Sequence, residues 1–202
     1  MRRTGLLALV ATIAGIGVVL AHQDAATGDN PFKTYLAVNA PPSLHPALQR
    51  AEKAFGRFQS RLYSRVDEEL QRGGALAALE VYRDEAAQLV TTITREDRLI
   101  RMGRTSHKLR NYRNAPPEWA SALVTEAAGR DSSVSPTWVV ELGTAVGVIA
   151  PLETRGNCVI CHGPVLSPEL AGAIRKAYPG DQATGFAPGQ VRGWVWAELA
   201  RR

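Results

Sequence analysis

The chain has 202 residues, which is enough for one domain with a hydrophobic core and too few to favour two. Hydrophobic residues make up 45% of it and charged residues 21%, as is ordinary for a folded globular protein. The formal net charge is +5, but no dense Lys and Arg tract runs through an aromatic segment. The composition therefore gives little support to nucleic-acid binding.

Residues 1–21 are typical of an export signal. Arg2 and Arg3 precede a 17-residue uncharged run that ends at Ala21, and Val19 and Ala21 suit a signal peptidase. An uncleaved membrane anchor is the alternative, because 17 residues is the lower limit for spanning hydrocarbon. Both interpretations place the rest of the chain outside the cytoplasm. We therefore expect a periplasmic or otherwise extracytoplasmic protein, with membrane contact only if this segment is retained.

The next segment, residues 22–42, is polar and contains three prolines, which predicts a flexible arm. The folded domain is expected to occupy residues 43–202. Apolar residues recur every three or four positions from Leu48 to Leu70, which predicts one face of a long helix that ends at Gly73-Gly74. A second helix follows with Leu79 and Tyr82 on one face. So short a break between two helices predicts a hairpin or a sharply bent pair.

The remaining elements alternate between short strands and helices. We expect strands near 99–102, 137–142, 144–152 and 190–199, and helices over 117–128 and 167–178. An ordered loop separates the first of these strands from Pro116-Pro117, and the two middle strands form a hairpin. Trp194 and Trp196 share a face of the last strand. Hairpin-connected strands with separate helices predict an α+β fold with an antiparallel sheet.

The only two cysteines stand in the stretch RGNCVICHGP, residues 155–164. Cys158 and Cys161 are two residues apart, and His162 follows directly. This C-x-x-C-H spacing suits covalent haem attachment, in which two thiols bond to the two vinyl groups of the macrocycle. The adjacent histidine is then placed to bind the iron as proximal ligand. The pattern predicts one haem c.

Three other interpretations of the cysteine pair have less support. A redox dithiol usually begins a helix after a strand in a βαβ setting, which is not predicted here. A zinc site needs four ligands, and there is no second cysteine pair. A disulfide across two residues is strained and closes a very short loop. Export and the use of both cysteines in one motif agree with haem.

Three segments resemble one known family, the exported single-haem c-type proteins with a PAS-like haem domain. The segments are GRTSHKLRNYRNAPPEW at 103–119, NCVICHG at 157–163 and AYPGDQATGFAPGQVRGWVW at 177–196. With GGALAALEVYRDEA in the second helix, the resemblance extends over about residues 45–200. It implies a PAS-like antiparallel sheet with long N-terminal helices, and haem held against the sheet. Members of this family occur alone and as sensory parts of signalling proteins.

The resemblance implies redox or small-ligand (gas) sensing, or one-electron transfer with a partner protein as a periplasmic cytochrome c. A haem enzyme such as a peroxidase has the least support, because no distal acid–base pair is identifiable. In the family, a cysteine in the second helix is an iron ligand. Here the matching residue is Tyr82, which also lies on the inward face of that helix. Tyr82 is therefore the candidate distal ligand, or else a core tyrosine, and His107 is its rival.

Six basic residues lie within residues 98–113. Because a guanidinium fork matches a carboxylate, Arg104, Lys108 and Arg110 are candidates for contacts with haem propionates. The alternative is a solvated basic loop. Trp194 and Trp196 either line the haem pocket or belong to the core.

The signal interpretation predicts that the mature protein starts at His22. N-terminal sequencing of the protein expressed with its own leader measures this directly. An intact Met1 in the membrane fraction would indicate an anchor, and soluble full-length protein in the cytoplasm would contradict both interpretations.

Overall fold

The computed structural model describes residues 31–128, 130–131 and 135–201. The expected export signal and residues 22–30 of the expected arm lie outside these residues. Within the described chain, no helix is both long and apolar enough to cross a membrane. The helices are α1 (His45–Glu96), α2 (Glu118–Glu126), α3 (Val159–His162) and α4 (Pro168–Ala177), and the strands are β1 (Thr34–Leu36), β2 (Arg101–Thr105), β3 (Trp138–Leu142), β4 (Ala145–Glu153) and β5 (Val191–Ala200).

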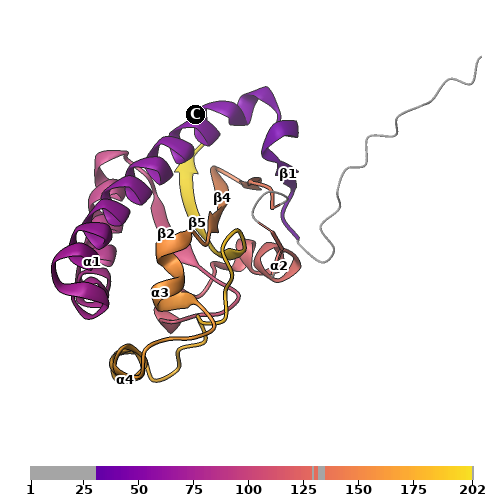
Figure 1. Ribbon diagram of the computed structural model, residues 1–202. Coiled ribbons are helices and arrows are strands. Elements are labelled where there is room, and N and C mark those ends of the chain that lie inside the picture. Colours follow the sequence, from indigo (N-terminus) through magenta and orange to yellow (C-terminus); the bar gives the residue numbers. More distant parts are fainter. Residues whose placement is uncertain (1–30, 129, 132–134, 202) are drawn as a thin grey trace, which may run out of the picture.

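The described strands form one antiparallel sheet in the order β1-β3-β4-β5-β2. Helix α1 covers one face of this sheet and α2 the other, while α3 and α4 lie at one end (Figure 1). The α+β class with an antiparallel sheet, expected from the sequence, is confirmed. The hairpin of β3 and β4 and the helices at α2 and α4 are also present.

Alternation along β5 decides which side chains meet which helix. Val195, Ala197 and Leu199 pack into the core under α1, whereas Trp194 and Trp196 point to the opposite face and pack near α2. The two tryptophans thus share a face, as strand geometry predicts. That face is the one turned away from α1.

The expected flexible arm needs correction between residues 34 and 42. Thr34–Leu36 pairs with β3 as an edge strand, and the Tyr35 hydroxyl donates to Glu141 Oε1 at 2.7 Å. Short 3-10 turns at Ala37–Asn39 and Pro42–Leu44 then lead into α1. Three residues of strand and several prolines produce no clear period in the sequence, so the pairing depends on the partner strand.

Helix α1 reverses direction at Gly74, as the Gly73-Gly74 break predicted. Gly74 has φ 72° and ψ −165°, a backbone conformation accessible almost only to glycine. The two halves then run back along each other (Figure 1). Ion pairs link them, with Arg65 Nη2 3.1 Å from Glu85 Oε1 and Arg61 Nη1 3.3 Å from Glu96 Oε2.

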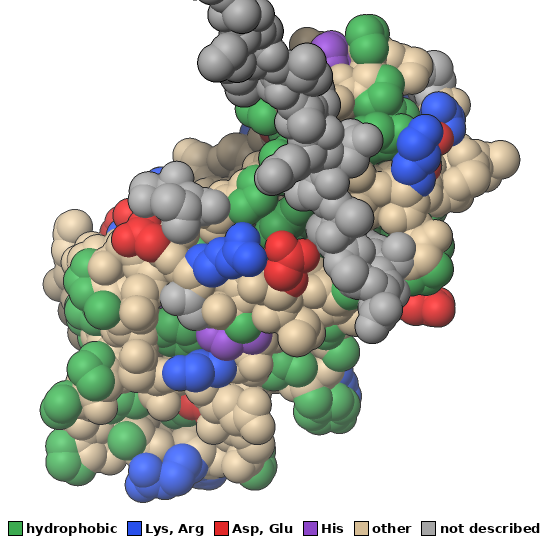
Figure 2. All heavy atoms as spheres, turned by 90° about the vertical axis from the view of Figure 1, so that its right-hand side faces the viewer, with side chains coloured by type: hydrophobic (Ala, Val, Ile, Leu, Met, Phe, Trp, Pro, Cys, Tyr) green, Lys and Arg blue, Asp and Glu red, His purple; other side chains and the backbone are tan. Residues whose placement is uncertain are grey.

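Figure 2 shows one face of the molecule, on which the coloured Lys and Arg side chains lie apart, some of them beside Asp or Glu. On the described part of this face the basic side chains do not join into a continuous surface. The positive net charge is therefore spread out on this side.

Replacement of Gly74 by alanine should lower the free energy of unfolding by about 1–3 kcal/mol, because a Cβ opposes this backbone conformation. Urea denaturation measures the change. Gly56→Ala is the matched control: it lies on the exposed side of α1, where an added Cβ meets nothing within 4 Å. The control should gain up to about 1 kcal/mol from helix propensity. Equal effects of the two substitutions would show that the reversal does not need glycine.

Candidate functional site

The cysteine motif forms a single helical turn after β4. A 3-10 turn over Gly156–Cys158 continues into α3, Val159–His162. Cys158, Cys161 and His162 therefore stand at positions i, i+3 and i+4, which lie on the same side of a helical turn. The local spacing in the sequence is enough to place the three side chains together.

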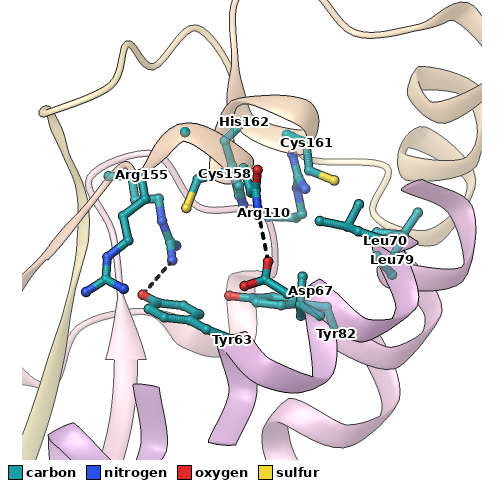
Figure 3. A pocket seen from close by; sticks show the side chains of 15 residues that line it. Tyr63, Asp67, Leu70, Leu79, Tyr82, Arg110, Arg155, Cys158, Cys161 and His162 are labelled. Atoms are coloured by element: carbon teal, nitrogen blue, oxygen red, sulfur yellow. Dashed lines mark hydrogen bonds between the residues drawn. The ribbon is translucent and has the colours of Figure 1, made fainter. Parts of the chain in front are cut away.

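A cavity of about 290 Å³ separates this turn from α1. That volume is just below the range of about 300–1,000 Å³ usual for ligand sites. Figure 3 shows Cys158, Cys161 and His162 projecting from one wall and Tyr63, Leu70, Leu79 and Tyr82 from the α1 wall. Both halves of α1 contribute, so the cavity depends on the reversal at Gly74. The lining residues are Tyr63, Val66, Asp67, Leu70, Ala78, Leu79, Tyr82, Arg110, Arg155, Gly156, Asn157, Cys158, Cys161, His162 and Arg192.

His162 is held in a defined orientation. Its Nδ1 lies 2.8 Å from the carbonyl oxygen of Ala183, so Nδ1–H donates and Nε2 keeps its lone pair. Burial lowers the pKa of His162 to about 3, and the nearby Arg192 and Arg110 add to the effect. The imidazole is therefore neutral at physiological pH. A neutral ring fixed through one nitrogen is the usual arrangement of a metal-binding histidine.

The two cysteines form no disulfide with each other. Burial raises the pKa of Cys161, so its environment does not favour a reactive thiolate. Among the described residues, no three His, Cys, Asp or Glu side chains converge as they would around a metal ion. Cys158, Cys161 and His162 thus share a cavity without forming a chelating cluster. This arrangement suits a large planar group better than a zinc ion.

Two tyrosines of α1, Tyr63 and Tyr82, contact arginines that come from other elements. Arg192 Nη2 donates to the Tyr63 hydroxyl at 3.2 Å, and the Arg155 guanidinium lies 5.2 Å from the centre of the Tyr63 ring. Arg104 donates to the Tyr82 hydroxyl. Burial opposes ionisation of Tyr82, but Arg104, Arg192 and Arg110 outweigh it and lower the pKa of the phenol. In Tyr63, by contrast, burial dominates and raises the pKa.

Tyr63 and Arg155 also line the cavity, but the sequence analysis did not identify them as site residues. Tyr63 precedes Val66 by three residues and Leu70 by seven, so it falls on the helix face that carries both. That spacing was a usable signal. No comparable pattern marks Arg155, which joins the cavity only because the cysteine turn folds over α1.

Three of the expected cofactor contacts lie elsewhere. Trp194 and Trp196 do not line this cavity, because β5 turns them to the α2 face. His107 is also outside it: its ring contacts Phe186 and Trp194 edge-on at centroid distances of 5.7 and 5.8 Å. In the described structure Trp194 lies in the core on the α2 face and Trp196 packs against it, which is the core alternative of the sequence analysis. His107 belongs to the same opposite face.

The three basic candidates separate in the structure. Arg104 and Lys108 do not line this cavity; both lie at a smaller, adjoining one. Arg110 does line it, but its guanidinium is already engaged. Its Nε pairs with Asp181 Oδ1 at 3.0 Å, and its Nη2 donates to the carbonyl oxygens of Cys161 at 2.6 Å and Ala183 at 3.2 Å. Arg110 is therefore a brace that joins the cysteine turn to the loop that orients His162.

Breaking this brace should destabilise the cysteine turn. Arg110→Met leaves the Asp181 carboxylate, 8% exposed, without its cation, which typically costs about 3–5 kcal/mol. Urea unfolding measures the loss, and Arg113→Met, an exposed arginine of the same loop, is the control. The double variant Arg110→Met/Asp181→Asn should recover part of the loss. A single variant as stable as its control would contradict the assigned role.

The model of the Tll0287-like family matches residues 21–198. A crystal structure of the cyanobacterial haem protein Tll0287 matches with a TM-score of 0.58 and 17% identity, covering 81% of this chain and 98% of that one. At this identity the match shows a shared fold. No curated protein matches the chain.

Proposed function

The chain belongs to the Tll0287-like family, and we propose that it is an exported protein that binds one haem c in the cavity between α3 and α1. Cys158 and Cys161 hold the haem through thioethers, and His162 is the proximal iron ligand. The family resemblance drawn from the sequence motifs is confirmed by the family match. The solved relative is a haem protein, which supports the same cofactor here.

One observation carries this proposal: a single cavity receives both thiols and a neutral imidazole already oriented through Nδ1. The residues present also fit haem in other respects. Leu70, Leu79 and Val66 offer an apolar surface for the macrocycle. The buried Nε of Arg192, which also lines the cavity, has no hydrogen-bond partner in the structure. A bound group with acceptor atoms would satisfy it.

The proposed role is redox or small-ligand sensing. Haem supplies a one-electron couple and a coordination position for a small ligand. The chain contributes Tyr63, Tyr82 and Arg192 at the cavity, all of which carry hydrogen-bonding groups. Polar groups near the iron decide whether a ligand is bound or excluded. This polar wall favours a responsive site over a purely apolar electron-transfer pocket, and one-electron carriage is the alternative.

Tyr82 is proposed as the distal ligand or as the residue that guards an open distal position. It lies on the α1 wall of the cavity, facing the wall that carries His162 (Figure 3). A tyrosinate is a known ligand of haem iron. The arginines that lower the pKa of Tyr82 make the anion more accessible than in an ordinary buried tyrosine. His107 is not proposed, because it lies outside the cavity.

Periplasmic expression with a c-type maturation system should raise the protein mass by one haem that resists acid–acetone extraction. His162→Ala should lose most of the haem or leave the iron in an altered spin state. His45→Ala, an exposed histidine that bonds the Ala40 carbonyl, is the control and should retain the normal spectrum. Recovery of protein at the apoprotein mass after extraction would overturn covalent attachment.

The distal assignment is tested by ferric absorption and electron paramagnetic resonance spectra. Tyr82→Phe should remove a phenolate charge-transfer band or change the spin state, while His107→Ala should leave both spectra unchanged. Tyr63→Phe is the matched control, because it removes the other phenol of the cavity. An effect of His107→Ala without one of Tyr82→Phe would show that the assignment is wrong. A carbon monoxide titration of the reduced protein separates sensing, which needs ligand binding, from carriage by a ligand-inert iron.

A further inference from the structure

A second cavity, of about 100 Å³, adjoins the proposed haem cavity. It lies between the second half of α1, the end of β2 with the loop that follows, and Tyr178 after α4. Tyr82, Arg110, His162 and Arg192 line both cavities. The candidate iron ligands His162 and Tyr82 therefore border both cavities.

The lining of this second cavity is unusually cationic. It contains five basic side chains and no Asp or Glu: the five are Arg83, Arg104, Lys108, Arg110 and Arg192. Two of them are already neutralised, since Arg83 pairs with Asp84 at 2.7 Å and Arg110 with Asp181 at 3.0 Å. Arg104, Lys108 and Arg192 have no carboxylate partner among the described residues.

The hydrogen-bond partners that the structure gives these three cations are hydroxyl and carbonyl oxygens. Arg104 bonds the Tyr82 hydroxyl, Lys108 Nζ lies 3.4 Å from the Thr184 carbonyl oxygen, and Arg192 bonds the Tyr63 hydroxyl. Two further polar atoms of the lining are buried without any hydrogen-bond partner, Arg192 Nε and Thr105 Oγ1. Three partly buried cations that face one cavity repel one another, and a buried polar atom without a hydrogen-bond partner is unfavourable. An anion in the cavity would relieve both costs.

We propose that this second cavity binds a carboxylate group. A guanidinium fork pairs with a carboxylate through two parallel hydrogen bonds, and the cavity is too small for a nucleotide or a sugar phosphate. The group has two possible sources, a free small carboxylate or a propionate of the haem next door. Binding of a free carboxylate does not depend on the proposed haem, whereas the propionate source does.

The position of the site gives the bound group a second effect. A negative charge beside His162 would stabilise the more positive ferric iron of the proposed haem. Occupation by a free carboxylate would therefore lower the reduction potential, and the oxidation state would in turn change carboxylate affinity. This reciprocal coupling, unlike binding itself, rests on the proposed haem.

The test uses the mature, haem-loaded protein freed of carboxylates by dialysis. Acetate is titrated in by isothermal calorimetry at constant ionic strength, with chloride as the reference anion. Arg104→Met and Lys108→Met keep the side-chain length and remove one cation each, and both should weaken acetate binding at least tenfold. Lys53→Met is the matched control, because Lys53 lies exposed on α1 outside the cavity, and it should bind acetate like the unmodified protein.

The same proteins without acetate give the second arm, the haem propionate bending band in resonance Raman spectra. Acetate binding that both cavity variants weaken and the control does not identifies the free carboxylate. No acetate binding, with a propionate band shifted in Arg104→Met or Lys108→Met but not in Lys53→Met, identifies the propionate. No acetate binding and unshifted bands would overturn the proposal. If the expressed protein carries no haem but still binds acetate, the haem proposal alone would be overturned. If Arg104→Met fails to fold, Lys108→Met still tests the cavity.

Discussion

The buried ion pair between Arg110 and Asp181 fixes the geometry on which the candidate site depends. Their side chains are 9% and 8% exposed, and the guanidinium reaches two further carbonyl oxygens, those of Cys161 and Ala183. Ala183 is also the residue whose carbonyl accepts from His162 Nδ1. One desolvated arginine thus connects the loop after β2, the cysteine turn and the segment that orients the imidazole. Because a buried charge requires its partners, these three segments are held in one arrangement.

The opposite wall of the cavity comes from a different constraint, the reversal of α1. The first half of the helix packs Phe55, Phe58 and Leu62 into the main core, and the second half returns with Ala86 and Ile93 in the same core. The end of the hairpin near Gly74 projects past this core, where Leu79 packs with Leu170 and Ile174 of α4. Apolar side chains of the hairpin are therefore left to line a cavity instead of the sheet.

The arginines around the cavity favour negative charge and oppose further positive charge. Burial lowers the pKa of His162, and three arginines lower it further: Arg104, Arg110 and Arg192. The same arginines lower the pKa of Tyr82, although burial alone would raise it. The same positive field opposes a further positive charge on iron, and so favours the reduced state of the proposed haem. Any anion that joins this cluster, a tyrosinate, a propionate or a free carboxylate, acts in the opposite sense. The balance between these positive and negative charges would therefore set the reduction potential of the proposed haem.

Local patterns in the sequence determined the elements and the chemistry of the motif. The helical period of α1, the glycine break and the C-x-x-C-H spacing all concern residues a few positions apart, where backbone geometry alone fixes which side chains share a face. Only the tertiary structure decided which face meets which neighbour. Strand alternation predicted that Trp194 and Trp196 lie on the same face. It did not predict that this face packs against α2 instead of lining the cavity. Likewise, Arg104 and Lys108 lie in a basic loop by sequence, and long-range packing against Tyr82 and Thr184 places them at the second cavity. The edge strand Thr34–Leu36 exists because β3 offers unpaired backbone groups to a segment with no periodicity of its own.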